Sequence, residues 1–107
     1  GANMDEVKVY MIANLNIEDK ETYRTYEKGF FPVLQKHGGE FITYDDSIDH
    51  LEGSTPLKGR VVFFSFPSET AARKWYSDPE YQELSKYRRK GAPLVSLTMV
   101  KGLPPRN

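Results

Sequence analysis

The stretch RVVFFSFPSETAARKWYSDPEY, residues 60–81, predicts one buried strand that leads directly into a helix and a turn. Between Arg60 and Phe66 apolar side chains occupy both alternating sets of positions, so this strand must be covered on both faces. Pro67 cannot donate to a sheet ladder and ends the strand, and Ser68 is a suitable N-cap for the run that follows. We therefore expect a strand, then a helix, with protein layers on both sides of the strand.

The same period-two pattern predicts three more strands, around residues 7–14, 40–44 and 95–99. Steps of three and four predict a helix that begins after Asp19, with a kink or a restart near Phe31 because Pro32 lies inside it. A further helical piece begins at Asp78-Pro79 and runs to about Arg89. The order strand, helix, strand, strand, helix, strand predicts a ferredoxin-like α+β fold, with a four-stranded antiparallel sheet and helices on one face.

Helices on one face leave the other face of this sheet uncovered, although its strands are apolar on both sides. A second copy of the same sheet is the expected cover. The sequence thus predicts a two-fold homodimer packed sheet to sheet.

Composition limits the partners and the compartment. The 107 residues suit a single domain, expected over residues 4–107, with residues 1–3 resembling an artificial extension ahead of Met4 and 103–107 an extended tail. Lysine plus arginine equal aspartate plus glutamate at 15 each, so net charge attracts neither nucleic acid nor membrane. There is no cysteine, no long apolar run and no secretory pattern at the start, which favours a cytoplasmic protein without thiolate chemistry.

Two classes of motif do not fit the sequence. RNA-recognition modules share this topology, but their stacking aromatics would fall at Arg60, Val62 and Ser65. No phosphate-binding or dinucleotide-binding glycine motif is present. We therefore expect neither a nucleic-acid partner nor a cofactor.

Several stretches also carry a family resemblance: YEKGFFPVLQKHGGEF, then LEG at 51–53, then GRVVFFSFPSETAARKWYSDPEYQELSKYRR, and VKG at 100–102. Together they resemble the domain of unknown function 1330 family over residues 10–102. The resemblance implies a dimeric α/β barrel, a superfamily that includes cofactor-free quinone-forming monooxygenases, small isomerases and ligand-sensing domains. It implies no particular reaction, because the family has none assigned.

Arg88 is the first candidate site residue, because Tyr81, Leu84 and Arg88 share one helical face, and it matches an arginine of the family's pattern. Such a cation can hold the carboxylate or enolate oxygen of a ligand, or it can form an internal salt bridge. Glu52, in the LEG turn, is either a general base or the salt-bridge partner of Arg88. These two residues are the predicted catalytic pair.

Aromatic residues at helical spacing supply the rest of the predicted ligand site. Trp75 and Tyr76 can form a wall for a planar ligand, and Tyr26 and Tyr81 can add phenol groups at its rim. Ordinary core and dimer packing is the alternative interpretation of all four. His50 lies among acidic residues, but no spaced ligand pair accompanies it, so no metal site is predicted.

Three hypotheses about function follow. The first is a small-molecule pocket between sheet and helices that binds an acidic or planar metabolite. The second is a cofactor-independent monooxygenase, isomerase or lyase, in which Arg88 steadies negative charge and Glu52 or a tyrosine moves a proton. The third is a structural or interaction module without chemistry.

Overall fold

The computed structural model describes residues 7–104, and the predictions for residues 1–3 and for the last residues of the tail lie outside this range. The elements along the chain are β1 (Val9–Leu15), α1 (Lys20–Lys36), β2 (Glu40–Asp45), β3 (Arg60–Phe66), α2 (Glu69–Ser77), α3 (Pro79–Gly91) and β4 (Leu94–Lys101). Each predicted strand is present, and the second predicted helical region is the pair α2 and α3.

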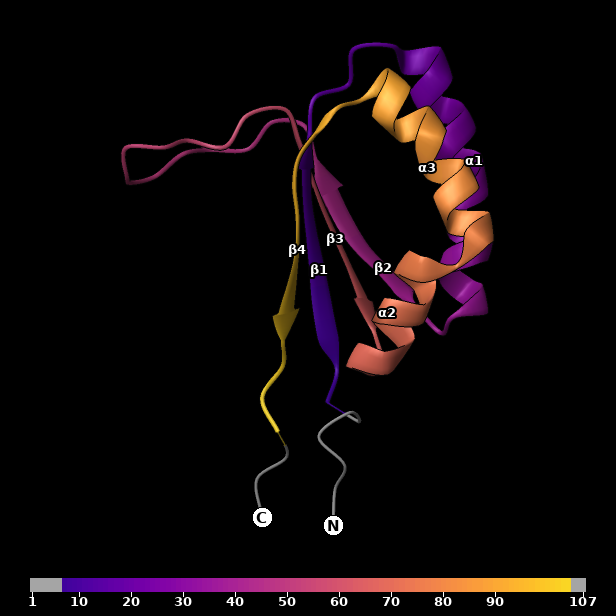
Figure 1. The fold of residues 1–107 in the computed structure, drawn as a ribbon. Coiled ribbons are helices and arrows are strands. Elements are labelled where there is room, and N and C mark those ends of the chain that lie inside the picture. The colour runs from indigo at the N-terminus through magenta and orange to yellow at the C-terminus, as the bar shows by residue number, and fades with distance from the viewer. Residues whose placement is uncertain (1–6, 105–107) are drawn as a thin grey trace.

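The four strands form one antiparallel sheet in the order β2-β3-β1-β4. Figure 1 shows all three helices on the same side of this sheet, with α1 and α3 lying alongside each other. This arrangement confirms the predicted ferredoxin-like α+β fold. None of the helices in the described chain is long and apolar enough to span a membrane.

The caps explain where the helices begin. The Asp19 side chain accepts a hydrogen bond from the Thr22 backbone, and Asp78 ends α2 while its carboxylate caps α3.

α1 continues through Pro32 as one helix, so the predicted restart near Phe31 does not occur. Pro32 lies on the exposed side, and buried residues on both sides of it keep the helix packed against the sheet.

The core fills the space between the helices and the sheet. Trp75 is completely buried, and its ring lies 4.1 Å from the Tyr81 ring and 5.3 Å from each of the Phe64 and Phe66 rings, centroid to centroid. These contacts bring α2, α3 and β3 together at one end of the core.

The sheet face turned away from the helices has no covering element among residues 7–104 (Figure 1). Tyr10, Phe63 and Val100 remain partly exposed there, at 39%, 39% and 45%. Residues 46–59 form a long loop without regular structure that projects from the sheet on this side. The uncovered face thus carries the exposed apolar residues that the patterns of β1 and β3 predict, beside polar ones such as Thr98.

Candidate ligand-binding cavity

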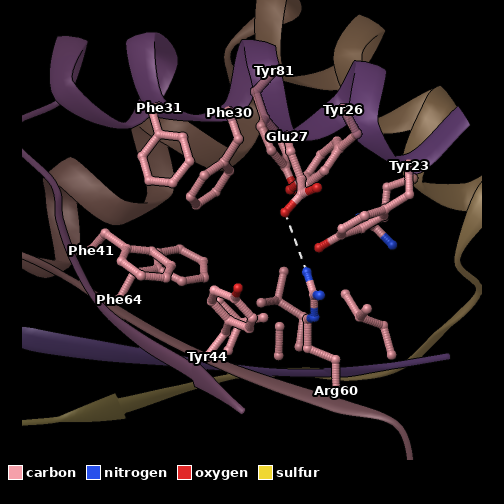
Figure 2. A pocket seen from close by; sticks show the side chains of 15 residues that line it. Tyr23, Tyr26, Glu27, Phe30, Phe31, Phe41, Tyr44, Arg60, Phe64 and Tyr81 are labelled. Atoms are coloured by element: carbon pink, nitrogen blue, oxygen red, sulfur yellow. Dashed lines mark hydrogen bonds and ion pairs between the residues drawn. The ribbon is translucent and has the colours of Figure 1, made fainter. Parts of the chain in front are cut away.

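A cavity of about 100 Å³ lies between the sheet and the helices α1 and α3. All four strands contribute to its floor, and the two helices form its roof (Figure 2). The fold therefore places residues from six separate elements around one small space.

Most of the lining is apolar. One end is aromatic, where Phe30 and Phe31 of α1 face Phe41 of β2 and Phe64 of β3 (Figure 2). The rings of Phe30 and Phe64 meet edge to face at a centroid distance of 5.2 Å, and those of Phe31 and Phe41 at 5.4 Å. The aliphatic part of the lining is Ala13, Leu15, Val62 and Leu97. Such walls favour a planar, apolar ligand body.

A pair of buried phenols forms part of the polar lining. The hydroxyl oxygens of Tyr26 and Tyr81 lie 3.1 Å apart, within hydrogen-bonding distance. Burial, reinforced by the Tyr81 hydroxyl, raises the pKa of Tyr26 well above its ordinary value. At neutral pH the Tyr26 phenol is therefore protonated and can donate a hydrogen bond, but it cannot act as a ready base.

Arg88 lines the same cavity from the last turn of α3 and is only 5% exposed. Within residues 7–104, no acidic side chain forms a salt bridge with it, although its position at the C-terminal end of α3 suits its positive charge. The position of this turn is fixed by Gly91, whose carbonyl accepts hydrogen bonds from the Glu18 and Asp19 backbones at 2.8 Å each. The cavity thus contains a buried cation without an anionic partner from the described chain.

A second arginine, Arg60, lies where β3 begins. Its Nε and Nη2 donate to the two carboxylate oxygens of Asp46 at 2.7 and 3.0 Å, and its Nη1 donates to Glu27 at 3.2 Å. Its guanidinium also lies 4.3 Å from the centre of the Tyr44 ring. The paired charges raise the pKa of Arg60 and lower that of Asp46, through the hydrogen bonds that join them. This ion cluster connects α1 to the base of the loop 46–59 beside the cavity.

The structure gathers some of the predicted site residues and separates others. Tyr26, Tyr81 and Arg88 all line the cavity. Trp75 lies behind it in the core, and Tyr76 is 44% exposed beside a separate hollow near α2.

Glu52 is exposed in the projecting loop and forms no salt bridge to Arg88. Figure 1 shows that loop on the opposite side of the sheet from α3. The pairing of Glu52 with Arg88 is therefore absent within one described chain, and a catalytic role for either residue stays a prediction.

Sequence reasoning missed Glu27 and Arg60. A usable signal existed for Glu27, because it lies four residues after Tyr23 on the apolar face of α1, where a carboxylate is out of place. For Arg60 no equivalent signal exists, because a charged residue at a strand terminus is ordinary.

The two histidines have local partners. His37 ends α1, and its Nε2 lies 2.7 Å from Asp78, while His50 bonds to the Gly53 carbonyl within the loop. Across the described residues, no group of three histidine, aspartate or glutamate side chains is arranged to hold a metal ion.

The fold and the cavity define the class: a small ferredoxin-like α+β protein with a partly open cavity between sheet and helices. The chain belongs to the DUF1330 family of domains of unknown function, whose model matches residues 8–103. The family resemblance of the sequence is thereby confirmed.

Solved structures with the same fold include RPA0582, a protein of unknown function from Rhodopseudomonas palustris. Its methylated form matches with a TM-score of 0.74 and 22% identity over 95% of this chain and 85% of that one. SnoaB, a cofactor-independent oxygenase from Streptomyces nogalater, matches at 0.64 with 10% identity over 92% and 96% of the two chains. A putative antibiotic biosynthesis monooxygenase from Chloroflexus aurantiacus matches at 0.56, with 10% identity over 94% and 97%. No curated protein matches the chain. At these identities the likeness shows a common fold.

Proposed function

We propose that the cavity binds a compact, planar, mostly apolar metabolite through a single acidic group that pairs with Arg88. The observation that carries this proposal is the burial of Arg88 in the cavity lining without an acidic partner in the described chain. An uncompensated buried charge costs several kcal/mol, and a carboxylate that meets a guanidinium in two parallel hydrogen bonds offsets much of this cost.

The size and the walls of the cavity set the rest of the ligand. A volume of about 100 Å³ is of the same order as an engineered cavity of about 150 Å³ that holds benzene, so the space suits roughly one ring. The aromatic residues Phe30, Phe41 and Phe64 favour a flat body. In the Tyr26–Tyr81 pair, the hydroxyl whose proton is not used in their mutual hydrogen bond can donate to the acidic oxygen of the ligand.

The second part of the proposal is a cytoplasmic homodimer in which a second copy covers the open sheet face. Exposed apolar residues on that face, including Tyr10, Phe63 and Val100, support it, because monomeric proteins rarely leave such a sheet face bare. The helical face that holds the cavity stays outside this interface.

A cofactor-independent oxygenase, isomerase or lyase is the second candidate. The shared fold with SnoaB and the placement of a neutral phenol pair in the same cavity as Arg88 favour it, because a cation and hydroxyl donors can stabilise an enolate or phenolate oxygen. If Glu52 is the base of such a reaction, its carboxylate has to come from another copy of the chain, since its own loop projects away from the cavity.

Binding of benzoate, compared with its neutral analogue benzamide, tests the proposal by calorimetry. We expect benzoate to bind the wild type and benzamide to bind at least about tenfold more weakly, because only benzoate carries the charge that Arg88 needs. Arg88→Met should remove this preference, and the adjacent exposed arginine in Arg89→Met provides the matched control.

Arg88→Met should also fold well without ligand, because methionine removes an unpaired buried charge and fills a similar volume. Equal binding of benzoate and benzamide, or an unchanged preference in Arg88→Met, would overturn the proposal. Product analysis after aerobic incubation with the bound acid separates an enzyme from a binding protein. If the folded protein binds no acid at all, the hypothesis of a structural or interaction module is the one that remains.

A further inference from the structure

Glu27 is the single carboxylate among the 15 residues that line the cavity. It lies on α1, four residues after Tyr23, and Figure 2 shows its carboxylate pointing down from the helix toward Arg60 on the floor. The side chain of Glu27 is 44% exposed, so this end of the cavity lies toward the solvent.

The charge of Glu27 is only partly neutralised. Asp46 holds Arg60 through two short hydrogen bonds, at 2.7 and 3.0 Å, whereas Glu27 shares a single longer one at 3.2 Å. One guanidinium thus faces two carboxylates. Lys20 and Arg24 line the neighbouring hollow together with this cluster but do not line the cavity, where Glu27 is the carboxylate that a ligand meets. The cavity therefore has a guanidinium at Arg88 without an acidic partner among residues 7–104, and a carboxylate at Glu27 that Arg60 holds by one long hydrogen bond.

We propose that Glu27 determines the ligand class: an aromatic or conjugated acid whose second substituent is a hydrogen-bond donor, a hydroxyl or an amino group. The carboxylate of Glu27 accepts a hydrogen bond from such a donor, and it repels a second anionic group placed there. Dicarboxylates of the same size are thereby excluded. This inference rests on the proposed pairing of the ligand's acid group with Arg88.

The probes are 3- and 4-hydroxybenzoate against the two dicarboxylates with the same substitution, isophthalate and terephthalate. With wild-type protein, calorimetry should give an affinity for the better hydroxy acid at least about tenfold above that for the matching diacid, because the second carboxylate of the diacid meets the like charge of Glu27 and cannot donate a hydrogen bond to it. Glu27→Gln should reduce this ratio several-fold. Glu83→Gln, which changes an exposed carboxylate on α3 that pairs with Lys86, should leave it unchanged.

Asp46→Asn supplies a second, independent variant. Without Asp46, the Arg60 guanidinium is free to neutralise Glu27, so diacids should bind more tightly although Glu27 is intact. An affinity ratio near one in the wild type, or the same ratio in both variants as in the wild type, would show that Glu27 does not select ligands. In that case benzoate binding that depends on Arg88 would keep the proposed function. Failure of every acid to bind in an Arg88-dependent way would remove both.

Discussion

The phenol oxygens of Tyr26 and Tyr81 lie 3.1 Å apart, and this contact joins the middle of α1 to the first turn of α3 inside the cavity. Because both side chains are almost fully buried, at 6% and 1% exposure, neither hydroxyl can turn to water when its partner is lost. Tyr26→Phe or Tyr81→Phe alone should lower the free energy of unfolding by about 1–2 kcal/mol. Urea denaturation measures this change.

The double variant Tyr26→Phe/Tyr81→Phe should be less destabilised than the sum of the two single changes, because no orphaned hydroxyl remains. Strict additivity would mean that the two hydroxyls contribute independently. Tyr87→Phe, at an exposed position of α3, is the control and should leave stability unchanged.

Stability should fall at alkaline pH in a way that depends on Tyr26. Burial raises the pKa of Tyr26 in the folded state above the ordinary value near 10 that it has when unfolded. Folding therefore favours the protonated phenol: the stability contribution is complete below pH 10 and is lost as the pH rises above it. Denaturation midpoints measured across the alkaline range should fall less steeply for Tyr26→Phe than for the wild type. Parallel curves for the two proteins would contradict this assignment.

Asp78 should make stability depend on acid pH. Its carboxylate caps α3 and lies 2.8 Å from Lys36 and 2.7 Å from His37, and these contacts hold its pKa below the ordinary value near 3.8. A lowered pKa stabilises the fold above pH 3.8, and this contribution is lost as the pH falls below it.

Asp78→Asn keeps a cap oxygen but loses the charge, so it should lower the thermal midpoint at pH 7. The difference from the wild type should shrink as the solution is acidified below pH 3.8. Asp49→Asn, in the exposed loop, is the matched control and should behave as the wild type at every pH. A pH-independent difference for Asp78→Asn would assign its role to capping alone.

A charge placed at the centre of the open sheet face should dissociate the proposed dimer. Phe63→Glu introduces a carboxylate on the β3 face that the proposed dimer covers, and the cost of burying it should shift the protein to monomer. Light scattering after size exclusion at micromolar concentration measures the mass. Tyr87→Glu changes an equally exposed aromatic residue on the helical side and should leave the mass unchanged. A monomeric wild type would rule out the dimer.

Gly59 should tolerate no side chain. It has a φ of +79°, and a Cβ there would collide with the Leu15 carbonyl and the Asn16 side chain. Gly59→Ala should lower the free energy of unfolding by about 2 kcal/mol or more, since strain and overlap act together. Gly53 also has a positive φ, of 107°, but nothing crowds it, so Gly53→Ala should cost only about 1 kcal/mol. Equal costs in denaturation experiments would show that the close approach is relieved without strain.

The sequence predicted the parts of the site that depend on local spacing. Tyr81 and Arg88 are seven residues apart and fall on one face of any helix that contains both, so their proximity was readable from the chain. The sequence could not show that Glu27 would lie beside Arg60, because these residues are 33 positions apart and meet only through the packing of α1 on the sheet. The separation of Glu52 from Arg88 was equally hidden, since the direction of the loop 46–59 depends on contacts at its base, such as the Asn14 amide donating to the Lys58 carbonyl at 2.7 Å.

By itself, the sequence determined the number and order of the strands and helices, the caps at Asp19, Ser68 and Asp78, and the ferredoxin-like fold, because periodicity and capping act over a few neighbouring residues. Tertiary structure alone decided which charges meet. Arg60 pairs with two carboxylates, and Arg88 pairs with none among the described residues. The packing of α1, α3 and the loop against the sheet sets the distances between these charges.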